Sequence, residues 1–133
     1  MNTNERTYLR QFEQRTLGPE SFDHRGHLYM AWAHLCVYEF DDANTRVCEG
    51  IRELATKFGA SDKFNWTLTE ALMRIMSGRM RDCPECSFDE FLEMNPDLLD
   101  DANGLLLRHY SEEVLGSPEA RKMWVEPDIC SFE

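Results

Sequence analysis

The sequence has few basic residues and no long hydrophobic run. Its 133 residues include 14 Lys and Arg against 25 Asp and Glu, which gives a formal net charge of −11. Proteins that bind nucleic acid or anionic membranes use clustered Lys and Arg, so we expect neither partner. No stretch approaches the roughly 18 apolar residues that span a bilayer, and the N-terminus is too polar for a signal peptide. These features favour a cytoplasmic protein.

The cysteines lack the even number and regular spacing of a disulfide framework. The five cysteines are Cys36, Cys48, Cys83, Cys86 and Cys130. An odd number without regular spacing is typical of reduced thiols, so no structural disulfide is expected, and Cys36 should be buried. Cys83 and Cys86 form a CxxC pair, which is at most half of a zinc site. The neighbouring Asp82 and Glu85 oppose the thiolate that a redox pair needs, so an acidic loop is expected there.

The chain is nevertheless rich in hydrophobic residues, which make up 42% of it, and in aromatic residues, which make up 11%. That content excludes an intrinsically disordered chain. Apolar residues recur at helical spacing and hardly ever alternate, which predicts an all-α protein. We expect a single domain over residues 1–133, a compact orthogonal bundle of about five to seven helices with an extended C-terminal tail. The expected helices cover about residues 4–16, 23–40, 44–58, 65–80, 87–94, 98–110 and 118–124.

Several short motifs predict where these helices begin and end. Gly18-Pro19 and Gly59 follow apolar helical stripes and are placed to end the first and third helices. Asn44 is the expected cap of the third helix. Thr67–Glu70 and Ser87–Glu90 each fit a capping box, with a hydroxyl residue three positions before a glutamate. Proline follows an expected cap residue at Asn95-Pro96 and Ser117-Pro118, which is typical of a helix start.

Two histidines stand at the start of the most apolar helix, which is expected to be central and buried. At about 100° per residue, His24 and His27 lie on the same arc as Leu28 and Leu35, so both should point inward. Burial and the positive end of the helix dipole both disfavour a charged imidazole. We therefore expect neutral histidines with lowered pKa values, the form that acts as a base or binds a metal.

A second polar pair, Asn65 and Thr69, shares one face of the fourth helix and could meet the histidines. This arrangement predicts a polar pocket that binds a small-molecule ligand through His24, His27, Asn65 and Thr69. If the protein is an enzyme, which the sequence leaves open, His24 or His27 is the candidate general acid or base. Two plainer interpretations stay open: the histidines belong to a hydrogen-bond network, and the Thr67 and Thr69 side chains satisfy free N–H groups at the helix start.

A metal site through His24 and His27 is the third possibility, which would make the protein a metal-binding enzyme. The HxxH pair supplies only two of the three or four ligands that such a site needs. We therefore expect no cofactor.

Most of the acidic excess lies in residues 82–101, which contain eight Asp and Glu and no Lys or Arg. The alternative function is therefore a helical protein–protein interaction module, in which this acidic face docks a protein partner or a second copy in a homodimer.

Several motifs together resemble an uncharacterised family of small bacterial all-helical proteins. They are Phe22-x-His24-x-x-His27-Leu28-x-x-Ala31-Trp32, Phe64-Asn65-x-Thr67-Leu68-Thr69, Asn95-Pro96-x-Leu98-Leu99, Tyr110-Ser111, Ser117-x-x-Ala120-Arg121 and Trp124-Val125-x-Pro127-Asp128. The resemblance spans nearly the whole chain and implies a helical fold and the location of the pocket, but no reaction. The family usually has histidine where this chain has Asn65. If three family histidines hold a metal, this chain lacks one ligand, because an amide is a poor substitute for imidazole.

Overall fold

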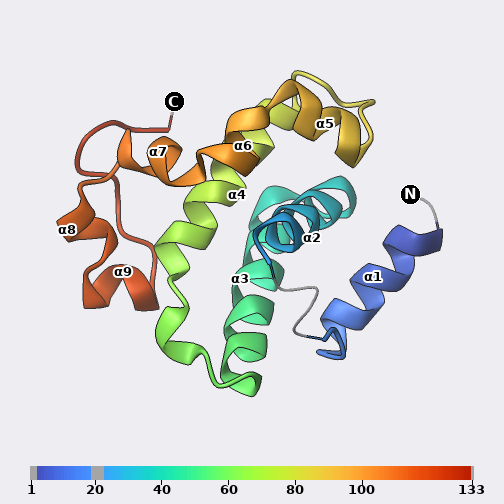
Figure 1. The fold of residues 1–133 in the computed structure, drawn as a ribbon, viewed down its shortest axis with the longest axis horizontal. Coiled ribbons are helices and arrows are strands. Elements are labelled where there is room, and N and C mark those ends of the chain that lie inside the picture. The colour runs from blue at the N-terminus through green and yellow to red at the C-terminus, as the bar shows by residue number, and fades with distance from the viewer. Residues whose placement is uncertain (1–2, 19–22, 133) are drawn as a thin grey trace. The chain divides into compact units, whose positions relative to one another are not determined.

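The computed structural model describes residues 3–18 and 23–132, and every regular element in those ranges is helical. The all-α fold class is thereby confirmed (Figure 1). The chain divides into two compact units, residues 1–64 and residues 65–133, which are described below one at a time. The single domain over residues 1–133 stays a prediction.

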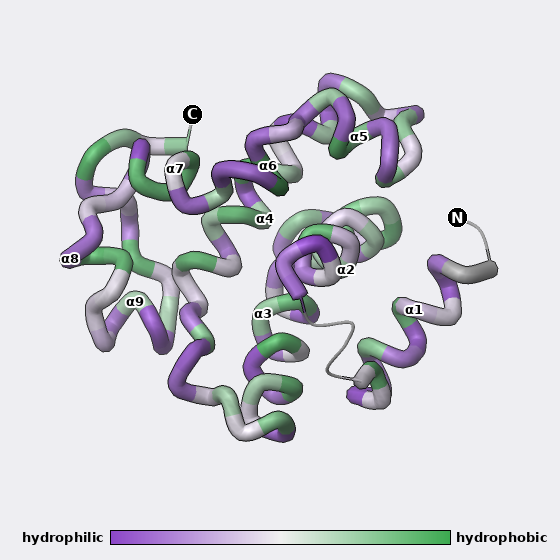
Figure 2. The backbone as a smooth tube through the Cα atoms, in the orientation of Figure 1, coloured by the Kyte–Doolittle hydropathy of each residue, from purple (hydrophilic) through white to green (hydrophobic). Residues whose placement is uncertain are grey.

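The described residues of the first unit form three α-helices that contact one another and one short 3-10 helix. They are α1 (Thr3–Glu13), α2 (His24–Val37), α3 (Phe40–Lys57) and the 3-10 helix η2 (Ser61–Lys63). Along α3, hydrophobic segments alternate with hydrophilic ones in Figure 2, the pattern of an amphipathic helix. Its buried side includes Val47, Ile51 and Leu54, as the sequence predicted.

The core of the first unit forms where α1 meets α2 and α3. Phe12 is fully buried, and its ring meets the ring of His34 edge-on with 5.0 Å between centroids. The same ring fills the space beside Gly50, where an added Cβ would lie 2.1 Å from it. Residues from Leu28 to His34 supply the buried face of α2. The expectation that Cys36 is buried is wrong, because the apolar run of α2 continues past the core into solvent.

Two helices of the first unit end in the same backbone motif, one at an expected residue and one not. Gly59 follows α3 with φ of 71°, and the Gly59 and Ala60 amides donate to the Thr56 and Ala55 carbonyls. This Schellman motif confirms the predicted stop at Gly59. Arg15 takes the equivalent place after α1, with φ of 59°. The first helix therefore ends at Glu13, three residues earlier than predicted.

The expected cap at Asn44 is wrong. Helix α3 begins at Phe40, with Glu39 as its N-cap, and Asn44 is buried within the helix. There its side-chain oxygen accepts a hydrogen bond from the Cys48 thiol. Pro19, part of the predicted stop after the first helix, lies outside the described residues.

The second unit consists of one long helix followed by shorter ones. They are α4 (Trp66–Met80), α5 (Phe88–Met94), α6 (Pro96–Asp100), α7 (Ala102–Leu107), α8 (Glu112–Leu115) and α9 (Pro118–Lys122). The described residues thus contain nine α-helices rather than five to seven. One cause is Asp101, where the backbone leaves helical geometry and splits the predicted 98–110 helix into α6 and α7.

Local capping signals in this unit were mostly correct. Ser87 and Glu90 form the predicted capping box at α5, and Pro96 and Pro118 stand in the first turns of α6 and α9. The predicted box at Thr67–Glu70 is wrong. Asn65 caps α4 instead, because its side chain accepts a hydrogen bond from the Leu68 amide.

The chain after α9 is extended and is bound to the rest of the second unit; we call residues 123–132 the C-terminal strap. The buried Thr67 hydroxyl donates to the Met123 carbonyl at 2.7 Å and accepts from the Val125 amide at 3.1 Å. Tyr110 donates its hydroxyl to the Val125 carbonyl, and Asp128 accepts from the Ser111 amide. Several residues of the Thr67, Tyr110-Ser111 and Trp124–Asp128 motifs therefore hold the strap in place.

Candidate functional site

The two predicted site histidines stand in the first turn of α2, which Asp23 caps through a hydrogen bond from the Gly26 amide. His24 is exposed and His27 is half-buried. The expectation that both point inward is therefore wrong for His24. Angular position predicts the direction in which a side chain points, whereas the buried part of α2 begins further along the axis, at Leu28. Phe22, the aromatic residue of the same motif, lies outside the described residues.

His27 has the predicted electrostatics. Burial lowers the pKa of His27, and the neighbouring His24 lowers it further, while Asp23 acts in the opposite direction. The backbone beside it is fixed by Tyr8, whose hydroxyl donates to the Gly26 carbonyl at 3.1 Å. A neutral imidazole at this position is able to accept a proton or a hydrogen bond.

Asn65 and Thr69 both make hydrogen bonds within the second unit. The Asn65 oxygen caps α4, and its amide nitrogen donates to the Leu115 carbonyl at 2.7 Å. The Thr69 hydroxyl donates to the Asn65 carbonyl at 3.1 Å, within its own helix. The cap of α4 is therefore Asn65, whereas Thr67 and Thr69, for which the sequence left this role open, donate their hydroxyls to carbonyl groups. Since the histidines belong to the first unit, a shared pocket of all four residues stays a prediction.

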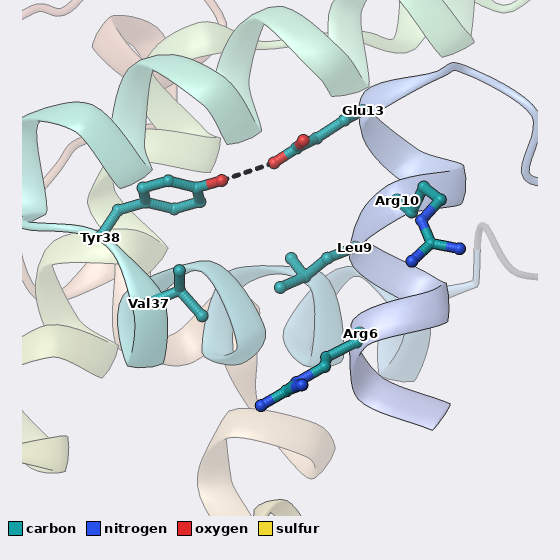
Figure 3. A pocket seen from close by; sticks show the side chains of 6 residues that line it. All are labelled: Arg6, Leu9, Arg10, Glu13, Val37 and Tyr38. Atoms are coloured by element: carbon teal, nitrogen blue, oxygen red, sulfur yellow. Dashed lines mark hydrogen bonds between the residues drawn. The ribbon is translucent and has the colours of Figure 1, made fainter. Parts of the chain in front are cut away.

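A pocket that the sequence did not predict lies in the first unit, between α1 and the C-terminal end of α2 (Figure 3). It has a volume of about 420 Å³, within the range of roughly 300–1,000 Å³ that is typical of small-molecule sites. Helix α1 contributes one face, on which side chains follow one another at helical spacing, and α2 contributes its end. The lining residues are Arg6, Leu9, Arg10, Glu13, Val37 and Tyr38.

One end of this pocket is closed by a hydrogen-bonded pair. Tyr38 donates its hydroxyl to the Glu13 carboxylate at 2.7 Å, which Figure 3 shows as a dashed line. Arg46 lies over the Tyr38 ring, 4.1 Å from its centroid, and 3.5 Å from the same carboxylate oxygen. The hydrogen bond to Glu13 is the main cause that raises the pKa of Tyr38, so the phenol stays protonated and remains the donor. The charge of Glu13 is thus already partnered.

The other charged groups of the pocket are two arginines, one helical turn apart on α1. Arg6 and Arg10 are both exposed. Their guanidinium groups have neither an ion pair nor a hydrogen bond with another residue in the described part of the chain. Between them lies Leu9, and opposite stands Val37, which is 50% exposed. The pocket therefore combines an apolar surface with two available cations.

The sequence did contain a signal for this pocket. Arg6, Leu9, Arg10 and Glu13 follow the i, i+3, i+4, i+7 spacing that brings side chains onto one face of a helix. A second signal lies at the end of α2. The apolar run of this helix is longer than the core covers, so the apolar side chain of Val37 is exposed.

His34 is a further polar group, in the buried part of α2. It is fully buried, and its Nδ1 donates to the Met30 carbonyl at 2.7 Å. The opposite nitrogen, Nε2, is buried without a hydrogen-bond partner among the described residues. Burial lowers the pKa of His34, so its imidazole is neutral within the aromatic core.

Cys83 and Cys86 form a disulfide, which overturns the expectation of no disulfide. The turn between α4 and α5 brings their Cα atoms to 5.6 Å, within the range that a disulfide requires. Cys36, Cys48 and Cys130 are free thiols. The odd cysteine count thus reflects one local disulfide and three thiols that belong to no disulfide.

The described residues contain no group of three or more His, Cys, Asp and Glu side chains placed to hold a metal ion. No helix within the described ranges is long and apolar enough to cross a membrane.

Comparison with known proteins adds no family. No protein-family model matches the sequence, no curated protein is significantly similar to it, and no solved structure matches its fold. The resemblance to a family of small bacterial helical proteins stays a prediction.

Proposed function

We propose that the protein is a small-molecule-binding helical domain whose ligand occupies the pocket between α1 and the end of α2. The observation that carries this proposal is the composition of that pocket. Its volume suits a small molecule, its surface at Leu9 and Val37 is apolar, and Arg6 and Arg10 carry charges available to a ligand. Binding sites typically combine an apolar surface with a few polar groups that orient the ligand.

The histidine-bearing end of α2 is a second place to look for ligand contacts. The lowered pKa of His27 supports a role as hydrogen-bond acceptor or base, and His24 stands one turn before it. Catalysis is better sought at this pair, because the carboxylate that lines the pocket, Glu13, already accepts a hydrogen bond from Tyr38 and lies beside Arg46, which makes it a weaker base. We therefore treat binding as the function and catalysis at His24 or His27 as a separate question.

The proposal is tested by screening a fragment library by ligand-observed NMR against the full chain and against two variants. Val37→Trp fills the pocket, and since Val37 is 50% exposed the larger ring is accommodated without disturbing the core. Met94→Trp, at a residue that is 61% exposed and does not line the pocket, is the matched control. We expect fragments that bind the wild type and Met94→Trp but not Val37→Trp. Fragments that bind all three chains equally, or no binding fragments at all, would overturn the proposal.

A second candidate function is protein–protein interaction through the acidic residues 82–101. Two large apolar side chains are exposed within this segment, Met94 at 61% and Leu99 at 39%. Apolar residues ringed by charge are typical of weak interaction surfaces. Reversing Glu93 and Asp100, which are exposed, should weaken association with a basic partner or a second copy. Glu90 and Asp97 are unsuitable for this test, because they form the α5 capping box and an ion pair with Arg79.

We further propose a cytoplasmic location. The support is that three of the five cysteines, Cys36, Cys48 and Cys130, form no disulfide, as is typical of a reducing compartment. Fractionation of cells that express the full chain tests this proposal.

A further inference from the structure

Resting on the proposed function, we infer the chemical class of the ligand: a small molecule that joins an acidic group to an apolar group. The acidic group, a carboxylate or a phosphate ester, pairs with Arg6 or Arg10. The apolar group covers the exposed side chain of Val37 and lies beside Leu9, which lines the pocket but is only 8% exposed. This assignment follows from three features of the pocket.

The first feature is the pair of arginines. Guanidinium groups stay charged at every physiological pH and present several N–H donors in one plane, which matches the oxygens of a carboxylate or phosphate. Arg6 and Arg10 are four residues apart on α1, and in Figure 3 their guanidinium groups extend in different directions on either side of Leu9. An acidic group that either arginine reaches gains a charge-assisted pair. No described residue supplies such an anion.

The second feature is that the Glu13 carboxylate already has interaction partners, which excludes a cation as the ligand. The Glu13 carboxylate accepts a hydrogen bond from Tyr38 at 2.7 Å and lies 3.5 Å from Arg46. A cationic ligand would have to compete with both groups while facing Arg6 and Arg10. The charge that the pocket offers to a ligand is therefore positive.

The third feature is the apolar surface beside the arginines. In Figure 3 the side chains of Leu9 and Val37 face each other between Arg6 and the Tyr38–Glu13 pair. Val37 is 50% exposed although it belongs to the most apolar helix of the chain. A purely polar anion would leave this surface in contact with water, whereas an attached apolar group removes it from water. The pocket thus favours an amphipathic anion over inorganic phosphate.

The experiment compares four probes that share one apolar chain and differ in the head group: octanoate, octyl phosphate, octylamine and 1-octanol. Dissociation constants are measured by titration into the full chain, with each probe below its micelle concentration. We expect octanoate or octyl phosphate to bind about tenfold or more tightly than 1-octanol, because only the acids form a charge-assisted hydrogen bond with an arginine. Whichever acid binds more tightly identifies the head group, and either result supports the inference.

Two double variants each remove two positive charges, one variant inside the pocket and the other outside it. Arg6→Gln combined with Arg10→Gln should abolish the preference for the acids over 1-octanol. Lys63→Gln combined with Arg108→Gln changes the net charge equally at exposed residues that do not line the pocket, and should keep the preference. Since all four residues are exposed, both doubles should retain the thermal stability of the wild type.

The outcomes separate the inference from the proposed function. If 1-octanol or octylamine binds as well as the acids and loses affinity in Val37→Trp, the pocket binds small molecules but the ligand class is wrong. If no probe binds and the fragment screen finds no ligand sensitive to Val37→Trp, the proposed function fails and the inference fails with it. Acid binding that persists in Arg6→Gln with Arg10→Gln also overturns the inference.

Discussion

Gly50 leaves the space on α3 that the ring of Phe12 fills, and this contact joins α1 to the core of the first unit. The ring also meets His34 edge-on. Because α1 contributes four of the six residues that line the pocket, the packing of Phe12 positions the pocket as well. Two predictions concern single residues: one concerns the space beside Gly50, and the other concerns the charge state of His34.

Gly50→Ala should destabilise the chain. The added Cβ would lie 2.1 Å from the Phe12 ring, so the ring or the helix must move. Overpacking of this kind costs about 1–3 kcal/mol, which exceeds the gain of roughly 1 kcal/mol from replacing a helical glycine. Gly78→Ala on α4 is the control, because its Cβ would meet only the Arg81 side chain at 3.6 Å. Urea unfolding should show Gly50→Ala less stable and Gly78→Ala as stable as wild type or more so.

His34 should make stability depend on pH. Its pKa in the folded chain is lowered by burial, so the unfolded chain takes up a proton, near pH 6.5, that the folded chain does not. Stability is therefore complete above that pH and decreases as the pH falls below it. The charged groups nearby, Glu13, Arg15 and Arg46, oppose one another. The lowered pKa of His27 makes stability depend on pH in the same direction.

His34→Met removes the buried titration and should flatten the curve of unfolding free energy between about pH 7 and pH 5. Urea denaturation at a series of pH values measures it. Parallel curves for the variant and the wild type would show that His34 does not titrate differently on folding.

Among the elements, the C-terminal strap shows how a segment without helix is held. Trp124 and Phe132 pack against the buried cluster of Ala71, Leu106, Tyr110 and Leu115. His109 joins the strap twice, through a hydrogen bond from Nδ1 to the Cys130 carbonyl at 2.8 Å and by stacking on Phe132. Trp124 and Phe132 of the strap are thus part of the packed core of the second unit.

Thr67→Val should loosen the strap. The substitution keeps the shape of the side chain but removes the hydroxyl that serves both Met123 and Val125. Losing both hydrogen bonds at a buried site costs about 1–3 kcal/mol. Thr69→Val removes a single hydrogen bond to a carbonyl of its own helix and should cost far less. Amide hydrogen exchange at Val125 should accelerate in Thr67→Val alone; equal effects of the two variants would contradict the strap contacts.

The turn between α4 and α5 gives the second prediction at this scale. Cys83 and Cys86 are paired, whereas Cys36, Cys48 and Cys130 are free. Alkylation of the unfolded chain without reductant should therefore modify three cysteines, and prior reduction should raise the number to five. Mass spectrometry counts the adducts. Five adducts without reduction, in protein purified without reductant, would show that the pair is not formed.

How far the sequence predicted these elements depends on how local each signal is. Ser87 with Glu90, Gly59 and Pro96 act within one helical turn, so their roles were predicted correctly. Arg15 was missed because its left-handed backbone conformation usually belongs to glycine, and here the guanidinium bonds the Phe12 and Glu13 carbonyls and pairs with Glu53. Contacts between distant residues carry no local signal. Thr67 reaches a carbonyl 56 residues further along, and its neighbours suggested only a cap.

The same distinction applies to the candidate site. The lowered pKa of His27 was predicted because its main cause is burial, which the apolar residues that follow it in α2 indicated, and its second cause is the nearby His24. The exposure of His24 was not, because it depends on where along α2 the packing begins. The Arg6 and Arg10 pocket was missed for a similar reason: its second wall is the end of α2, and only the fold brings that end to α1.

At the scale of the whole molecule, charge is distributed unequally between the two units. Residues 1–64 carry 8 basic and 10 acidic residues, a net charge of −2, and residues 65–133 carry 6 and 15, a net charge of −9. The acidic excess that argues against a polyanionic partner therefore belongs mainly to the second unit. The first unit is nearly balanced, which is compatible with a pocket for a small anion at Arg6 and Arg10.

Chemical-shift mapping of octanoate on the isotope-labelled full chain tests the central claim most directly, because it locates the ligand residue by residue. The account predicts that the largest amide shifts fall in residues 6–13 and at Val37 and Tyr38, and that Val37→Trp abolishes them. Shifts concentrated at His24, His27, Asn65 and Thr69, or no saturable shifts at all, would contradict it.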